Sequence, residues 1–149
     1  MAFDAPSLKG RALRLLSQRE HSRLELERKL AKYEEEPGTL AKALDELTAR
    51  DFLSETRVVQ SVVHQRASRM GALRVRQELQ QKGIGADAIA GAMEQLKSTE
   101  LERAREVWRR RFGQPPADAA ERAKQTRFLL ARGFSGEVVR RVLSLSDDL

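Results

Sequence analysis

The amino-acid sequence predicts an all-α protein, built as an elongated and curved tandem array of three units with three helices each. Apolar residues recur at helical spacing along nearly the whole chain, and no segment shows the sustained alternation of a β-strand. Charged residues make up 34% of the chain and aromatic residues only 5%, which favours helices with wide solvated faces over a thick globular core. The third observation is a repeat of apolar positions about every 49 residues.

Boundary signals divide the chain into helices. Ser22 followed by Glu25, and Thr99 followed by Glu102, have the spacing of a capping box, in which side chain and backbone bond each other at a helix start. The nine expected helices run near residues 8–18, 22–33, 39–50, 54–69, 71–83, 86–97, 99–112, 116–132 and 135–146.

Single residues mark further boundaries. Ser54 and Ser135 are expected N-caps, because a serine hydroxyl accepts a hydrogen bond from a free amide of the first turn. Gly83 and Gly133 stand where a helix end favours a residue with positive φ. Pro115-Pro116 marks a loop before the eighth helix.

The repeat is clearest at Leu30, Leu79 and Leu129, which are separated by 49 and then 50 residues. Two more apolar sets keep these separations in the helices that follow: Leu40, Ile89 and Val139, and Leu44, Met93 and Leu143. The helices therefore group into three units, at residues 1–53, 54–98 and 99–149. Since a three-helix unit has little core of its own, stacking of neighbouring units is expected to stabilise the array.

Two departures from the repeat are expected. The middle helix of the third unit begins at Pro116 and should be about one turn longer than its counterpart, which begins at Gly71. The first unit has Tyr33-Glu34-Glu35-Glu36 where the other units have their glycine, so its second helix should end differently.

Several classes of chemistry are excluded by composition. The chain has no cysteine, which excludes disulfides, thiolate metal sites and cysteine nucleophiles and fits an intracellular, cytoplasmic protein. No apolar run indicates a signal peptide or a membrane span. His21 and His64 have no partners at metal-ligand spacing and are expected on solvated helix faces.

Catalysis is not expected either. The nine glycines form no phosphate-binding loop, and the serines stand mainly at helix starts. No nucleophile, base and orienting group can be assembled into one site. We therefore expect a monomer that is not an enzyme, with no catalytic residues, no metal, no cofactor, no small-molecule substrate and no membrane partner.

The charge of the chain points to an anionic partner. The formal net charge is +6 and the pI is near 10.2, which suits nucleic acid, an acidic protein surface or anionic lipid, although solubility alone would also explain it. The first unit is neutral, with ten basic and ten acidic residues. The second has seven basic against four acidic, and the third eleven against eight. The basic surface is therefore expected on the second and third units.

Aromatic residues give no sign of base stacking. Trp108, Phe112, Phe128 and Phe134 stand at core spacing beside aliphatic residues, so they are interpreted as packing. Any contact with DNA is therefore expected to be made through phosphates, without strong sequence choice. The acidic runs at residues 34–36 and 147–148 are expected to be solvated.

Three segments together resemble the RecX family of bacterial regulatory proteins. They are Arg19–Leu30 (REHSRLELERKL), Glu78–Ile84 (ELQQKGI) and Leu129–Phe134 (LLARGF). Their order, spacing and the total length agree with the family, and the resemblance covers almost the whole chain. Besides the missing glycine of the first unit, Ser54-Glu55 replaces the acidic pair usual at the start of the fourth helix.

The resemblance implies a tandem array of three-helix units that lies in the groove of the RecA–DNA filament. It implies restraint of RecA strand exchange, ATP hydrolysis and coprotease action in recombination, DNA repair and the SOS response. The family brings no catalytic residues to transfer. Two other hypotheses stay open: a stand-alone DNA-binding protein, since three-helix units can resemble helix-turn-helix domains, and a helical-repeat scaffold for another acidic protein.

The partner-binding residues are predicted from the charge distribution. They are expected to contact RecA or DNA phosphates, and all belong to the second and third units. These residues are Arg66, Arg74, Arg76, Lys82, Arg109, Arg110, Arg127, Arg132, Arg140 and Arg141.

Overall fold

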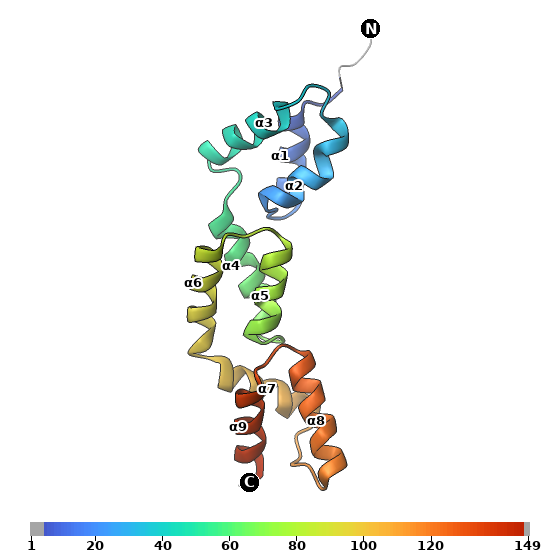
Figure 1. Cartoon of the computed structure of the whole chain (residues 1–149), viewed down its shortest axis with the longest axis vertical. Coiled ribbons are helices and arrows are strands. Elements are labelled where there is room, and N and C mark those ends of the chain that lie inside the picture. Colours follow the sequence, from blue (N-terminus) through green and yellow to red (C-terminus); the bar gives the residue numbers. More distant parts are fainter. Residues whose placement is uncertain (1–4, 148–149) are drawn as a thin grey trace.

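The computed structural model describes residues 5–147 and shows an elongated array whose three units follow one another along a shallow arc (Figure 1). Within these residues every regular element is a helix, as predicted. The elements are α1 (Leu8–Gln18), α2 (Arg23–Leu30), the 3₁₀-helix η1 (Ala31–Tyr33), α3 (Thr39–Ala49), α4 (Glu55–Arg66), α5 (Ala72–Gln81), α6 (Ala86–Lys97), α7 (Glu100–Arg111), α8 (Ala119–Ala131) and α9 (Gly136–Asp147).

The ends of the chain limit two expectations. Residues 1–4 and 148–149, which the outer units were expected to include, lie outside the described residues, and so do both side chains of the acidic pair at 147–148. The proposed boundaries after residues 53 and 98 stay a prediction.

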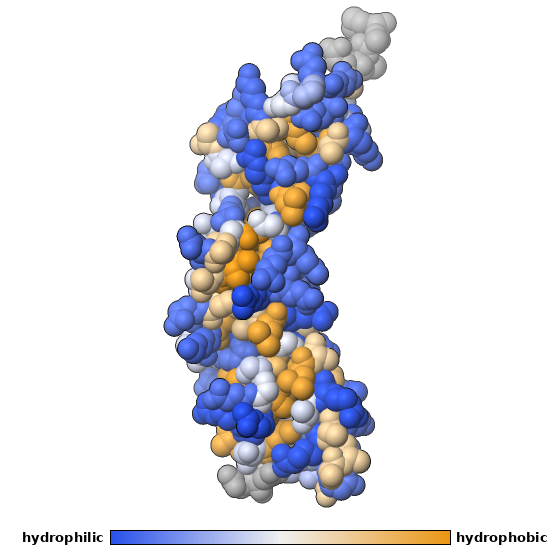
Figure 2. All heavy atoms as spheres, in the orientation of Figure 1, coloured by the Kyte–Doolittle hydropathy of each residue, from blue (hydrophilic) through white to orange (hydrophobic). Residues whose placement is uncertain are grey.

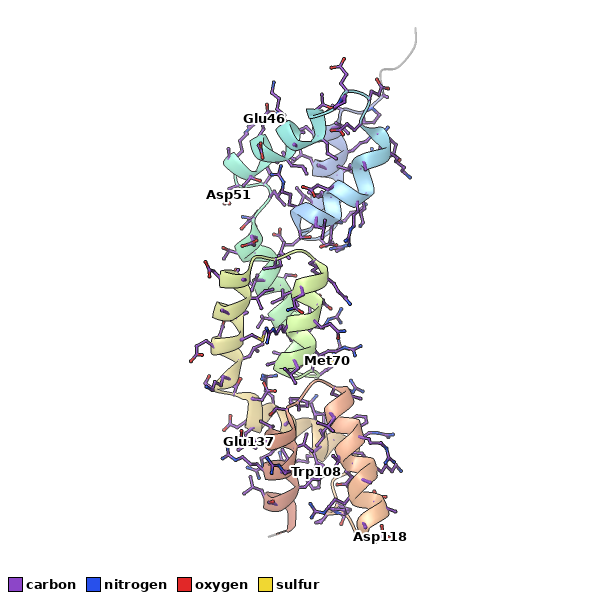
Figure 3. All side chains as sticks on the ribbon, in the orientation of Figure 1. Glu46, Asp51, Met70, Trp108, Asp118 and Glu137 are labelled. Carbon is purple, nitrogen blue, oxygen red and sulfur yellow. The ribbon has the colours of Figure 1, made fainter. Side chains whose placement is uncertain are left out.

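Each unit has its own hydrophobic core. The first core is formed by α1, α2 and α3, the second by α4, α5 and α6, and the third by α7, α8 and α9. Trp108 lies inside the third unit, where its indole N–H donates to the buried Gln125 at 2.8 Å (Figure 3). The aromatic residues of this unit therefore pack, as predicted.

The residues that define the repeat occupy equivalent core positions. Leu30, Leu79 and Leu129 are exposed by 2%, 0% and 0%. In the helix that follows, Leu40 and its two counterparts are also buried. Burial at equivalent positions is the reason for the period in the sequence, because each unit fills the same small space between three helices.

Most of the expected caps are present. Glu25 donates its amide to Ser22 Oγ at 3.1 Å, and Ser22 donates its amide to Glu25 Oε1 at 3.0 Å, which completes the capping box. Ser54 and Ser135 cap α4 and α9 by accepting from the amide three residues ahead.

The capping box at Thr99 was a wrong prediction. Thr99 occupies the N-cap of α7, but its side chain accepts no hydrogen bond from a backbone amide of the first turn. The hydroxyl donates instead to the Leu96 carbonyl at 3.4 Å and accepts from Arg103 Nε at 3.0 Å. The Thr99 side chain therefore links the last turn of α6 to Arg103 of α7.

The start of α8 also differs from the prediction. The helix begins at Ala119 and not at Pro116, because Asp118 is the residue that caps it, accepting from the Glu121 amide at 2.8 Å (Figure 3). The expected extra length is confirmed, since α8 has 13 residues and α5 has 10. The second helix of the first unit ends in η1, as its missing glycine led us to expect.

The two repeated glycines end α5 and α8 in the same way. Gly83 and Gly133 have φ values of 75° and 93°. The amide of Ile84 then donates to the Leu79 carbonyl at 3.1 Å, which is the bond of a Schellman motif, and the amide of Phe134 makes the equivalent bond. The turn returns a large apolar side chain to the core of its own unit.

These glycines also touch the preceding unit. A Cβ atom at Gly83 would lie 2.8 Å from Leu24 Cδ2, in the first turn of α2. One at Gly133 would lie 2.6 Å from the backbone nitrogen of Arg74, in the first turn of α5. Each unit thus places the end of its middle helix on the start of the middle helix before it, at a distance that leaves no room for a side chain.

Backbone hydrogen bonds join the second unit to the third. The amide of Gly71 donates to the Arg132 carbonyl at 2.7 Å, and the amide of Leu73 donates to the Gly133 carbonyl at 3.1 Å. Free amides at the start of α5 are therefore satisfied by carbonyls at the end of α8.

A largely buried ion pair reinforces this junction. The Glu100 carboxylate accepts from the Ala72 amide at 3.2 Å and from Arg103 at 2.8 Å. Arg103 also donates to the carbonyls of Ala67 and Met70, at 3.0 and 2.8 Å (Figure 3). The start of α7 is thereby held against the loop between α4 and α5.

Ion pairs between side chains join the first unit to the second. Lys82 Nζ lies 3.1 Å from Glu25 Oε1, and Arg57 Nε lies 2.9 Å from Glu20 Oε1. Burial alone raises the pKa of Glu25, but hydrogen bonds from Arg19, the Ser22 amide and Lys82 outweigh it and lower the pKa from 4.5 to about 2. This carboxylate is therefore charged whenever the protein is folded under ordinary conditions.

Replacing Gly133 by alanine should weaken the fold, because the new Cβ would need a positive φ and would press on Arg74. We expect the free energy of unfolding to fall by on the order of 3 kcal/mol, measured by urea denaturation. Gly136→Ala is the control, since nothing lies within 4 Å of its Cβ position. Equal stability of the two variants would contradict the close approach.

Acid should weaken the protein through Glu25. Its folded pKa of about 2 is below the value of 4.5 that it has without its partners, so the unfolded chain binds more protons between these values. The stabilisation is present above 4.5 and is lost as the pH falls toward 2. Glu25→Gln, which keeps the capping oxygen, should flatten this dependence in urea titrations across the acid range, whereas Glu27→Gln should keep it.

Candidate interaction surface

The cations predicted to bind a partner are in different situations in the structure. In the second unit, Arg66 Nε lies 3.0 Å from Glu78 Oε1 and holds α4 to α5, and Lys82 belongs to the junction with the first unit. Both side chains are half-buried. These two residues have structural partners within the chain, whether or not they also meet a partner molecule.

Arg74 and Arg76 are both exposed, but they lie on opposite sides of α5. Two positions along a helix correspond to a rotation of about 200°. Arg74 lines a small recess together with Arg66, whereas Arg76 lines a groove that also includes residues of the third unit. The cations of the second unit therefore do not form a single patch.

The predicted cations of the third unit are mostly exposed. Arg109 and Arg110 both pair with Glu106, at 2.9 and 3.3 Å, on the solvated side of α7. Arg132 is half-buried and places its guanidinium 5.0 Å from the centre of the Phe128 ring. Arg127, Arg140 and Arg141 are exposed.

A groove with a volume of about 920 Å³ runs between the second and third units. Its apolar lining includes Leu73, which is 54% exposed, and Val138 of α9. Figure 2 shows apolar surface on the middle unit that continues over the third, with hydrophilic side chains on both sides. The groove brings together Arg76 and Arg141 of the predicted set, and adds Lys97, which the sequence did not single out.

A second hollow, in the first unit, was missed by the charge count. Of the residues that the structure describes, five basic side chains and no acidic one line it. The equal numbers of acids and bases in this unit hid their separation onto different faces. The signal was nevertheless present, since Arg11 and Arg14 stand one helical turn apart, as do Arg28 and Lys32.

His21 is buried, with 1% of its surface exposed, so the expectation of a solvated face was wrong for this residue and correct only for His64. His21 Nδ1 lies 3.0 Å from the Arg19 carbonyl and Nε2 lies 3.0 Å from Lys29 Nζ. A carbonyl only accepts and an ammonium only donates, so Nδ1 carries the proton and the ring is neutral. Burial, followed by the charges of Arg19 and Lys29, lowers its pKa despite the bond to the carbonyl.

Within residues 5–147, no group of three or more metal-binding side chains comes together. In the same range, no helix combines the length and apolar character that a membrane span requires.

Comparison with known proteins gives three matches to family models. Residues 9–47 match the first three-helix domain of RecX, residues 54–93 the second and residues 98–143 the third. A solved RecX structure from Lactobacillus salivarius has the same fold, with a TM-score of 0.81 over 95% of this chain and 96% of that one at 19% identity.

Relatives with high sequence identity bear the same name. The regulatory protein RecX of Leptothrix cholodnii is 60% identical over 99% of this chain and 95% of its own length. The regulatory protein RecX of Ralstonia nicotianae is 53% identical over 96% of this chain and 90% of its own length. With three matching domains in the family's order and relatives that align from end to end, this chain belongs to the RecX family of regulatory proteins.

Proposed function

We propose that this protein binds the RecA–DNA filament in the cytoplasm and modulates RecA, mainly by inhibition. The affected activities are strand exchange, ATP hydrolysis and coprotease action, in recombination, DNA repair and the SOS response. The observation that carries the proposal is the succession of three RecX domains along nearly the whole chain. The protein acts as a monomer without a cofactor or small-molecule substrate.

The shape of the molecule suits a filament. An elongated array can contact neighbouring protomers at the same time, so that several weak contacts add up. Because the second and third units are joined through backbone hydrogen bonds, their two surfaces meet the filament in a fixed relation. Binding to one filament state then shifts the population of states by the difference in affinity.

The exposed cations for which no ion pair is seen within residues 5–147 are the best candidates for the contact. Arg76 and Arg141 lie at one groove although they are distant in the sequence, and the groove offers apolar surface between them. Glu94, Glu100 and Glu137 line the same groove. An interface usually has this composition, with an apolar centre and charged residues at its edge. Arg109 and Arg110 would first have to leave Glu106, which reduces what they contribute.

The proposal is tested by the DNA-stimulated ATPase of RecA. Addition of the protein at a sub-stoichiometric ratio should lower the rate by about half or more, because one bound molecule affects several protomers. Electron microscopy of the same samples should show shorter filaments. An unchanged rate together with unchanged filaments would overturn the proposal.

Removing the charge at the groove should weaken inhibition. We expect Arg76→Gln with Arg141→Gln to raise the concentration for half-inhibition roughly tenfold, equivalent to about 1.4 kcal/mol of binding free energy. The control is Lys42→Gln with Arg50→Gln, which removes the same charge from exposed positions on α3. Circular dichroism checks that helicity is kept, and equal inhibition by both double variants would place the contact elsewhere.

A further inference from the structure

The hollow in the first unit is unusual in its charge. It has a volume of about 720 Å³ and lies where the start of α1 faces the end of α2 and η1. Five basic side chains line it, and among residues 5–147 no aspartate or glutamate does. These side chains, with the aromatic ring beside them, are Arg11, Arg14, Arg28, Lys29, Lys32 and Tyr33.

Within residues 5–147, none of the five cations is paired with a carboxylate. Other basic residues of the same unit do pair with carboxylates, since Arg19 pairs with Glu25 and Arg23 pairs with Glu27. The unit therefore divides its cations into a neutralised group and an unneutralised group. Five cations of the unneutralised group converge on one concave space, whereas Lys42 and Arg50 lie on another face of the unit.

Two of these cations are held in place by uncharged groups. The Arg11 guanidinium lies 3.7 Å from the centre of the Tyr33 ring. Lys29 Nζ donates to the neutral His21 ring at 3.0 Å. Such contacts orient a cation but leave its charge uncompensated, so the hollow keeps its positive potential while losing side-chain freedom.

The chemistry of the hollow suits phosphates joined in a strand. Close cations repel one another in the free protein, and a polyanion relieves this repulsion by contacting several of them. Guanidinium groups bind phosphate oxygens in pairs. The start of α1 adds the partial positive charge of a helix N-terminus, with no acidic residue in its first turn.

The shape and the aromatic ring favour an unpaired strand. Tyr33 is 39% exposed, and Leu15 and Leu30 add apolar lining to the hollow. An unpaired base can enter a recess and lie against its aromatic wall. The bases of a duplex are paired and stacked inside the helix, so they cannot enter the recess. We propose that this hollow binds the phosphates of single-stranded nucleic acid, with one nucleotide against Tyr33.

This site is separate from the surface proposed to contact RecA. It lies in the first unit, whereas the groove lies between the second and third. Its binding requires only the free chain and a strand, so it does not rest on the proposed function. Together the two sites would let one molecule contact the protein and the nucleic acid of a filament at different points along its length.

The test is titration of the full chain into a fluorescently labelled oligothymidylate of about 12 nucleotides, followed by anisotropy at several salt concentrations. Arg14→Gln with Arg28→Gln removes two exposed cations of the hollow for which no internal contact is seen. We expect roughly tenfold weaker binding and a log–log salt slope that is shallower by about 1.4, since each lost phosphate contact contributes about 0.7.

Lys42→Gln with Arg50→Gln is the matched control, because it removes the same charge from another face of the same unit. Its affinity should stay within about twofold of the parent, since screened charges at a distance contribute little. Equal weakening by both double variants, or no binding by the parent chain at low salt, would overturn the site.

Amide NMR shifts with the same oligonucleotide locate the contact independently. Shifts concentrated at residues 6–15 and 28–33 support the site, and shifts confined to the second and third units overturn it. A duplex of the same length and free ATP are the comparison ligands. If either binds as tightly as the single strand, the preference for an unpaired strand is wrong.

Discussion

The structure depends on a close approach that only glycine allows. Gly83 and Gly133 end the middle helices of their units, and the same atoms touch the first turn of the middle helix before them. The glycine that ends the helix is thus also the residue that contacts the neighbouring unit. A unit of three short helices buries too little apolar surface to be stable alone, so the contact that stacks the units also sustains each of them. The repeat in the sequence therefore has two causes: the leucines recur because each unit has a core, and the glycines recur because the units stack closely.

The two junctions use different physics, and this gives the array different properties along its length. Between the second and third units, backbone amides at the start of α5 meet backbone carbonyls at the end of α8, and these bonds depend little on salt. Between the first and second units, ion pairs such as Lys82 with Glu25 make the connection, and salt and acid weaken such pairs. Salt is therefore expected to weaken the first junction more than the second, which has backbone hydrogen bonds besides its Glu100–Arg103 ion pair.

The sequence predicted the fold better than it predicted which residues form the surface. Leucines spaced for three cores and a capping box at Ser22 are local or periodic signals, and both were confirmed. Thr99 failed because the Leu96 carbonyl and the Arg103 side chain occupy its hydroxyl, and His21 failed because Lys29 satisfies its ring inside the unit. The residue pattern alone does not show which side chain will occupy a polar group once the helices have packed. Arg66 looked like a free cation for the same reason.

Formal charge is consequently a poor guide to where the unneutralised cations of this protein gather. The third unit has the largest number of basic residues, yet Arg109 and Arg110 share one carboxylate on a solvated helix face. The first unit has no net charge, yet Arg14 and Arg28 line a hollow that has no acidic residue in its described lining. What attracts a phosphate is the local excess of unneutralised cations around a concave surface, and opposite charges elsewhere in the unit are screened within about 10 Å at ordinary salt. A protein can therefore be neutral over a whole unit and still bind an anion there, provided that the fold sorts its charges by face.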